Sequence, residues 1–269
     1  MSFQLYKPSA ILSPYIKQYW AMSCMLKPGE QHVQRIIPNG FIELIFYLDK
    51  HPEYIRNNSS FKSGSIINGQ QKGFYDIIVR EKLNLVSIVF KPQGAKLFLN
   101  LPVSEIYDQS IPAALIFKNE INELQSKMQE AIGEHQRIKL IEIFLIDQLK
   151  KKKEYEYQRI SDSVNYINSS KGSITIEKLS DRACLSKKQF ERSFTSFVGI
   201  TPKKFLRTIR FQYTVYNQQI RNFKNLTELA FESGYYDQSH MINDFKELSG
   251  LTPKQYFDDC EVISDYFSS

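Results

Sequence analysis

The stretch Leu179-Ser180-Asp181-Arg182-Ala183-Cys184-Leu185-Ser186, followed by Phe190, Phe194 and Gly199-Ile200-Thr201-Pro202, decides the fold. It recurs as Leu229-Ala230-Phe231-Glu232-Ser233-Gly234-Tyr235, followed by Met241, Phe245 and Gly250-Leu251-Thr252-Pro253. Leu179 and Leu229 are 50 residues apart but Phe194 and Phe245 are 51 apart, so the second copy holds one inserted residue at 236–237. Each copy predicts a short amphipathic helix, a tight turn and a second helix, which is the layout of a helix-turn-helix.

The two units are predicted to span residues 175–198 and 225–249. Ser186 with Gln189 forms a capping box for the second helix of the first unit, and Asp237 caps its counterpart. Because apolar residues at helical spacing form one core stripe, the other side chains of these helices face outward. A helix of this kind enters the major groove, so double-stranded DNA is the predicted ligand. The predicted DNA contacts are Lys187, Lys188, Glu191, Arg192, Gln238, Ser239 and Asn243.

The distribution of charge favours the same ligand. The chain carries a net charge of +6, and residues 182–210 hold eight cations against one anion, Glu191. Such a stretch is often only a solvated face, but here it lies on the first unit and the helix after it, where phosphates are expected. That helix, predicted from Pro202 to about Asn222, is roughly 30 Å long, close to the roughly 34 Å between successive major-groove faces. Repeated helical pairs also build solenoids, but two copies are too few for one.

The first half of the chain predicts a small β-sheet or barrel, so the fold class is α+β. Strands are expected at 33–37, 41–48, 65–67, 76–80 and 83–91, the first two joined as a hairpin by Pro38-Asn39-Gly40. Helical periodicity from 118 to 150, broken at Gly133, predicts an antiparallel helical pair or a dimerisation surface. We expect an N-terminal domain over 1–150, a linker at 151–157 that follows a lysine run, and an all-α domain over 158–269.

Composition argues against several classes of protein. The three cysteines Cys24, Cys184 and Cys260 show no C-x-x-C spacing, so no disulfide framework or zinc site is expected, and Cys184 is expected in the core. The four histidines are scattered, so we expect no metal and no cofactor, and no enzyme motif is present. No apolar run is long enough to span a bilayer and no signal peptide is evident, so a cytoplasmic protein without membrane contact is expected.

Residues 160–260 resemble the DNA-binding domain of AraC/XylS-type transcription regulators. The resemblance rests on Cys184-Leu-Ser-x-x-x-Phe190-x-x-x-Phe194 and on Ala230-x-x-x-Gly234-Tyr-x-Asp-Gln-Ser239 with Gly250-x-Thr-Pro253. Met241 stands where that family usually has Phe, and it fills a similar core volume. The resemblance implies a bacterial activator that contacts RNA polymerase, and an N-terminal cupin-like barrel that senses a small-molecule effector or forms a homodimer.

The candidate effector site centres on Glu43, a charge inside an apolar strand. A buried carboxylate requires a partner or a ligand. Arg35 on the neighbouring strand is the simpler explanation, as a structural ion pair. The alternative is an effector site for a polar small molecule, lined by Trp20, Arg35, Glu43 and Tyr47. Two other readings stay open: a regulator without an effector, and an enzyme with a DNA-targeting module.

Overall fold

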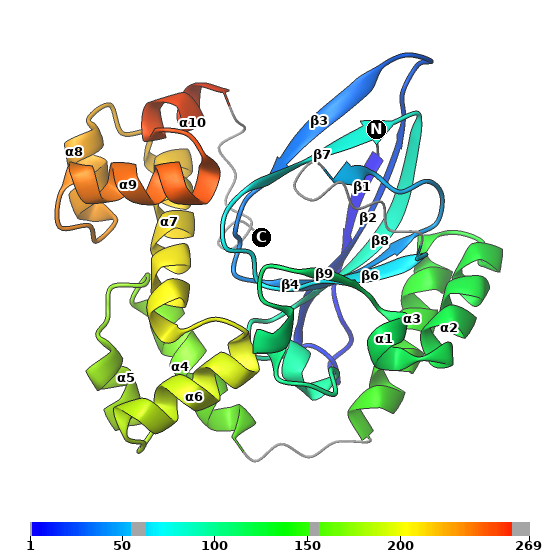
Figure 1. Ribbon diagram of the computed structural model, residues 1–269, viewed down its shortest axis with the longest axis horizontal. Coiled ribbons are helices and arrows are strands. Elements are labelled where there is room, and N and C mark those ends of the chain that lie inside the picture. Colours follow the sequence, from blue (N-terminus) through cyan, green and yellow to red (C-terminus); the bar gives the residue numbers. More distant parts are fainter. Residues whose placement is uncertain (1, 55–62, 151–155, 260–269) are drawn as a thin grey trace. The chain divides into compact units, whose positions relative to one another are not determined.

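The computed structural model describes residues 2–54, 63–150 and 156–259. The chain divides into two compact units (Figure 1). The first comprises residues 1–36, 41–70 and 75–155, and the second comprises 37–40, 71–74 and 156–269. Strands in the first and helices in the second confirm the α+β class. Most of the linker predicted at 151–157 lies outside the described residues. No helix among the described residues is both long and apolar enough to cross a membrane.

The N-terminal unit contains two antiparallel sheets. The larger sheet has the strand order β1 (Ser2–Tyr6), β2 (Ile16–Met25), β8 (Lys82–Phe90), β4 (Ile42–Tyr47), β6 (Ser65–Asn68) and β9 (Ser110–Pro112). The smaller sheet has the order β3 (Gln31–Ile36), β7 (Tyr75–Arg80) and β5 (Glu53–Tyr54). Ile45 and Tyr47 of β4 share an apolar core with Tyr75 and Val79 of β7, so the two sheets pack face to face.

Helices cover the other face of the larger sheet. Short 3₁₀ helices at Ala95–Leu97 and Val103–Ile106 lead to α1 (Ala114–Phe117), α2 (Asn119–Glu130) and α3 (Glu134–Lys150). The chain reverses between α2 and α3 at Gly133, whose φ of 81° suits a residue without a side chain. Tyr19 of β2 donates a hydrogen bond of 3.2 Å to Glu142 of α3, and burial raises the pKa of this tyrosine. The helical pair predicted from 118 to 150 therefore packs within its own domain.

The predicted hairpin between residues 33–37 and 41–48 is wrong. Strand β4 pairs with β8 and β6, whereas β3 pairs with β7 in the other sheet. Burial explains the difference. Strand β4 is largely buried on both faces and therefore takes a neighbour on each side, while Gln31–Gln34 of β3 is exposed and suits an edge.

Arg35 is bound to Asp76, its neighbour across the β3–β7 pair. The Nε and Nη2 atoms donate to the two carboxylate oxygens at 2.8 and 2.9 Å. Ile36 and Tyr75 pack on the core, so alternation turns Arg35 and Asp76 to the opposite face of the sheet. The hydrogen bond from Arg35 lowers the pKa of Asp76, and this outweighs the opposing effect of burial.

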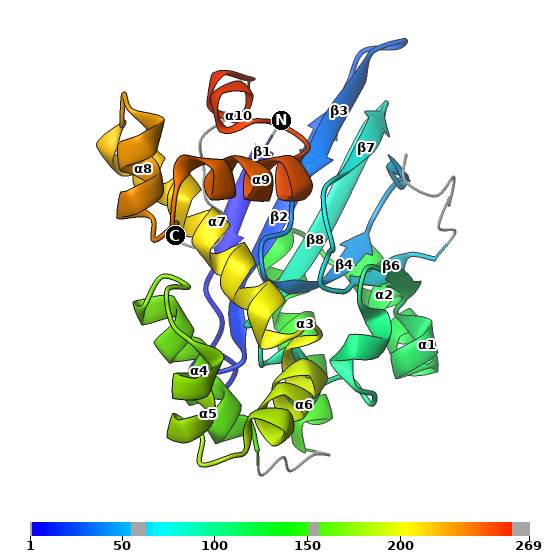
Figure 2. The same ribbon diagram turned by 60° about the vertical axis from the view of Figure 1, so that its left-hand side comes forward.

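The described residues of the second unit from 156 onward form helices joined by loops. Its helices are α4 (Tyr157–Ser169), α5 (Ile176–Arg182), α6 (Lys187–Val198), α7 (Pro202–Arg221), α8 (Leu226–Glu232), α9 (Gln238–Ser249) and α10 (Pro253–Asp259). Helix α7 runs between the α4–α6 group and the α8–α10 group (Figure 2). Phe205 of α7 meets Phe194 of α6 with ring centroids 5.6 Å apart, and Phe211 meets Phe245 of α9 at 4.8 Å.

The Arg35–Asp76 pair predicts a pH dependence of stability. Because the pKa of Asp76 is lower in the folded chain than its ordinary value of 3.8, the pair stabilises the fold above that pH and is lost as pH falls through the folded value. Asp76→Asn should therefore lower the free energy of unfolding at neutral pH by about 1 kcal/mol or less, as for a partly exposed pair. Urea unfolding at several pH values measures this, with Arg35→Met and the double variant as a cycle. A destabilisation that persists unchanged at pH ~2.5 would contradict it.

Candidate nucleic-acid interface

The first helix-turn-helix unit consists of α5 and α6. The Thr175 side chain caps α5 by accepting a hydrogen bond from the Lys178 backbone. The predicted capping box at the start of α6 is confirmed, with Ser186 and Gln189 each accepting from the backbone of the other. Cys184 forms the turn with a φ of 53° and is exposed, so the prediction that it lies in the core is wrong. The backbone conformation of the turn, with its positive φ, places the Cys184 side chain at the surface instead of in the core.

The second unit repeats this arrangement with α8 and α9. Asn225 caps α8 by accepting from the Thr227 backbone, and Asp237 caps α9 by accepting from the His240 backbone at 2.7 Å. Gly234 occupies the turn with a φ of 79°. Both second helices end at a left-handed glycine, Gly199 or Gly250, as the Gly-x-Thr-Pro pattern requires.

Core packing leaves the predicted contact residues on the outer faces. Phe190 and Phe194 of α6 and Met241 and Phe245 of α9 have no exposed surface. On the other faces, five of the predicted contacts are exposed, and Glu191 and Gln238 are half-buried. The exposed five are Lys187, Lys188, Arg192, Ser239 and Asn243. The structure thus brings Lys187, Lys188, Glu191 and Arg192 together on α6, and the other three on α9.

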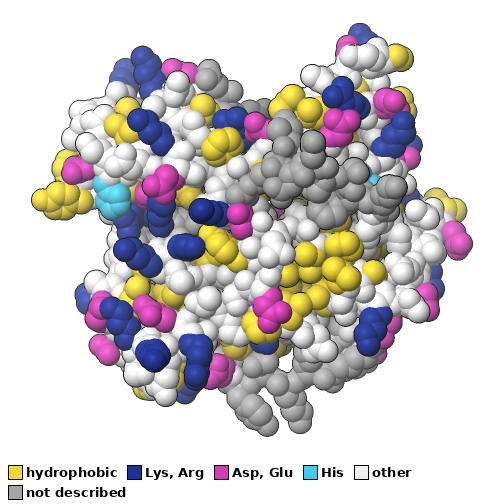
Figure 3. Space-filling model, in the orientation of Figure 1, with side chains coloured by type: hydrophobic (Ala, Val, Ile, Leu, Met, Phe, Trp, Pro, Cys, Tyr) yellow, Lys and Arg dark blue, Asp and Glu magenta, His cyan; other side chains and the backbone are white. Residues whose placement is uncertain are grey.

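The cations of the basic stretch differ in what they already bind. Lys and Arg side chains gather over α5, α6 and α7 (Figure 3). Arg207 is bound to Asp244 and Glu247, and Lys187 is bound to Glu177 at 2.7 Å. Within the described part of the chain, Lys188 and Arg192 have no such partner. These two are therefore the cations of α6 that are free to bind an anionic ligand.

The start of each second helix is tied to the start of the first, a contact that sequence reasoning missed. Lys187, the first residue of α6, pairs with Glu177 of α5, which lowers the pKa of that carboxyl and raises the pKa of the lysine. Gln238, the first residue of α9, accepts a hydrogen bond of 2.9 Å from Thr227 of α8. Glu177 and Thr227 are 50 residues apart and Lys187 and Gln238 are 51 apart, which are the offsets of the repeat. The repeat in the sequence therefore indicates that the two contacts occupy equivalent positions.

Two further residues stand out on the second unit. Tyr236 lies at the inserted position just before the α9 cap and is 85% exposed. His240 is exposed on the first turn of α9, and its ring meets that of Tyr235 edge-on at 5.3 Å. The one-residue shift between the copies marked this position in the sequence, but its exposure followed only from the structure.

Three of the four predicted effector residues share a sheet face. Trp20 lies opposite Ser87, which lies opposite Ile45, so alternation places Trp20, Glu43 and Tyr47 on the face that looks toward the second sheet. Glu43 accepts a hydrogen bond of 2.8 Å from Ser87. Arg35 is bound to Asp76 in the smaller sheet and does not share this face. No group of three or more metal-binding side chains occurs among the residues that the structure describes.

Two family models match the chain. Residues 4–112 match one described as a domain of unknown function (DUF6597), and residues 179–259 match one described as a helix-turn-helix domain. An uncharacterized HTH-type transcriptional regulator of Haemophilus influenzae is 31% identical over 81 residues. That match covers 30% of this chain and only 27% of the relative.

Solved structures resemble the chain more distantly. ToxT from Vibrio cholerae O395 has a TM-score of 0.47 at 13% identity, over 89% of this chain and 97% of that one. The DNA-binding domain of AdpA in complex with a target DNA has a TM-score of 0.34 at 22% identity, over 36% of this chain and 88% of that one. Likeness at this level decides nothing about what the present chain binds. The helix-turn-helix match and the two capped helical pairs agree, and residues 179–259 belong to the helix-turn-helix domains of the AraC type.

Proposed function

We propose that the chain is a transcription regulator that binds double-stranded DNA in a sequence-specific manner. The observation that carries the proposal is a pair of capped helices, α6 and α9, joined by one helix and bearing outward polar faces. Helix α7 has 20 residues and is therefore about 30 Å long. Successive major-groove faces of B-DNA lie about 34 Å apart. A connecting helix of this length supports the proposal that α6 and α9 enter adjacent grooves.

The two helices are proposed to read DNA with different chemistry. On α6, Arg192 suits the O6 and N7 acceptors of guanine, Glu191 accepts from cytosine N4, and the lysines bind phosphate. On α9, Gln238, Ser239 and Asn243 offer amides and a hydroxyl, which suit adenine N6 and N7. Lys188 and Arg192 favour this assignment, because neither has to give up an ion pair with a described residue to bind DNA.

Selection of bound sequences from random duplex DNA, with purified full-length protein at fixed salt, tests the function. Two enriched motifs about one helical turn apart are expected. Binding that depends on salt but enriches no sequence would overturn the proposal of sequence-specific regulation. Activation through RNA polymerase and homodimer formation stay predictions from the family resemblance.

The N-terminal unit is proposed to bind a polar small molecule on the sheet face that carries Trp20, Glu43 and Tyr47. The support is a carboxylate placed beside aromatic rings on a largely apolar face. Arg35 is left out, because it is bound to Asp76. A polar compound that raises the unfolding temperature identifies an effector. Glu43→Gln keeps the shape of the side chain and removes its charge, so it should lower the affinity for that compound at least tenfold. Asp76→Asn is the control. If no polar compound raises the unfolding temperature, the alternative of a dimerising or protein-binding domain is favoured.

Arg192→Ala tests direct base reading. If Arg192 forms a bidentate contact to a base, its loss should weaken binding to the selected site by roughly 1–3 kcal/mol and relax the preference at one position. Competition binding with single-base variants of that site measures both effects. Lys203→Ala, which removes an exposed cation from α7, is the matched control. A uniform loss across all sequences would assign Arg192 to phosphate.

Lys187 and Glu177 form a matched pair for testing phosphate contact. Lys187→Ala should reduce the slope of log affinity against log salt by about one unit, because one fewer counterion is released. Glu177→Gln removes an anion beside the lysine, so it should raise affinity at low salt. Titrations across a salt series measure both. Identical slopes for Lys187→Ala and the unaltered protein would remove the phosphate role of this lysine.

A further inference from the structure

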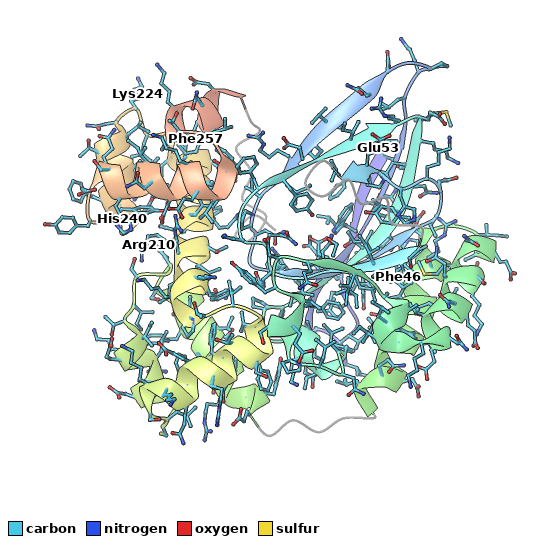
Figure 4. The ribbon with its side chains drawn as sticks, viewed as in Figure 1. Phe46, Glu53, Arg210, Lys224, His240 and Phe257 are labelled. Atoms are coloured by element: carbon cyan, nitrogen blue, oxygen red, sulfur yellow. The ribbon has the colours of Figure 1, made fainter. Side chains whose placement is uncertain are left out.

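One side chain of α7 touches both the loop that leads into the first helix-turn-helix unit and the turn of the second unit. Arg210 donates from Nη2 to the carbonyl of Gly172 at 3.3 Å, and its guanidinium carbon lies 5.3 Å from the centroid of the Tyr235 ring. Gly172 belongs to the loop before α5, and Tyr235 belongs to the turn between α8 and α9. Figure 4 shows Arg210 on α7, with His240 on the neighbouring α9. Arg210 therefore links the loop that leads into the first unit, the connecting helix α7 and the turn of the second unit.

The backbones of the two units also approach each other closely at this point. A Cβ atom at Gly234, in the turn of the second unit, would lie 2.1 Å from Oγ of Ser173 in the loop before α5. A Cβ atom at Gly172 would lie 2.6 Å from the Leu206 carbonyl oxygen of α7. Both glycines have positive φ, 79° and 75°. Both close approaches thus require residues without side chains. The first places the turn of the second unit against the α4–α5 loop, and the second places that loop against α7.

We propose that this seam, formed by Gly172, Ser173, Arg210, Gly234 and Tyr235, sets the spacing between the two DNA half-sites that one chain recognises. Helix α7 sets the distance between the two helix-turn-helix units, and their rotation about this helix sets the relative orientation of α6 and α9. A step of one base pair corresponds to about 3.4 Å of rise and roughly 35° of rotation. A modest rotation of one unit about α7 would therefore move its preferred site by a base pair.

The chemistry of Arg210 suits a positioning residue. Its planar guanidinium stacks on an aromatic ring while its N–H groups donate in the plane, which a lysine cannot reproduce. Tyr235 is 3% exposed, so the ring that Arg210 covers is fixed in the core of the second unit. The Arg210 guanidinium links the α4–α5 loop to the turn of the second helix-turn-helix unit, so it acts by fixing their relative orientation. This inference rests on the proposed function, because spacing has meaning only for a chain that reads two half-sites.

Selection from random duplex DNA compares the unaltered protein with Arg210→Met and Gly234→Ala. The unaltered protein is expected to select one spacing. Each variant should keep the base preferences of both half-sites and accept spacings at least one base pair longer and shorter. Adding Ser173→Gly to Gly234→Ala removes the clashing Oγ, so the double variant should narrow the spacing again. Gly133→Ala, with a φ of 81° and open space around it, controls for backbone strain alone.

A single spacing in folded Arg210→Met would overturn the proposal and leave α7 as the sole determinant. Loss of base preference in one half-site would also overturn it, because that result means local damage to one unit.

A second measurement does not involve DNA. Spin labels are attached at Lys178→Cys on α5 and Lys246→Cys on α9, with Cys24, Cys184 and Cys260 replaced by Ser. They report the distance between the two helix-turn-helix units.

The distance distribution should be narrow in the labelled parent and clearly broader with Arg210→Met. Equal widths would refute the positioning role, whatever the protein binds. If the unaltered chain selects no sequence, the proposed regulator function fails. The spin-label distances then still show whether the seam holds the two units in one orientation.

Discussion

The placement of both α6 and α9 depends on the buried apolar residues of α7. Phe205, Ile209, Phe211 and Val215 are fully buried along this helix. At 3.6 residues per turn, the first two and the last two lie on different sides of it. The first unit packs on its beginning through Phe194, and the second unit packs further along through Phe245 and Met241. Helices as short as α5 and α8 are not stable in isolation, because nucleation costs more than a few hydrogen bonds return. The separation of α6 and α9 is therefore a consequence of core packing.

Local signals predicted the C-terminal unit well. The caps predicted at Ser186 and Asp237 both occur, because a capping side chain bonds to a backbone group only three residues away. The period of 3.6 residues then fixed which side chains of α6 and α9 face outward. The prediction that Cys184 lies in the core was wrong, because the orientation of a turn residue depends on its φ and not on helical periodicity.

The N-terminal unit shows the opposite behaviour. The sequence located β4 and β8 to within a residue or two, but it paired β4 with the wrong neighbour. Strand pairing depends on contacts between distant residues, and a turn signal such as Pro38-Asn39-Gly40 does not show whether two strands share a sheet. The same limit applied to Arg35. The predicted ion pair of Arg35 with Glu43 is wrong, because it depended on that hairpin. Arg35 binds Asp76, which lies 41 residues away on β7.

The basic stretch is a structural element as much as a binding surface. Arg207 neutralises Asp244 in the core of the second unit, Arg210 links the α4–α5 loop to the turn of that unit, and Arg182 lies over the Tyr166 ring at 4.2 Å. Only cations that phosphate neutralises add to the salt dependence of binding, so the net charge of this segment overstates its contribution to DNA affinity.

On α6, Lys188 and Arg192 have no ion pair with any described residue. The outward residues proposed for α9 are uncharged. On the proposed ligand the two units are therefore unequal. The first supplies most of the electrostatic attraction, whereas the second depends on hydrogen bonds that form only against the right bases. Such a second unit gains little from a non-specific duplex, so its engagement distinguishes the operator from other DNA, provided that α7 holds it at the correct groove.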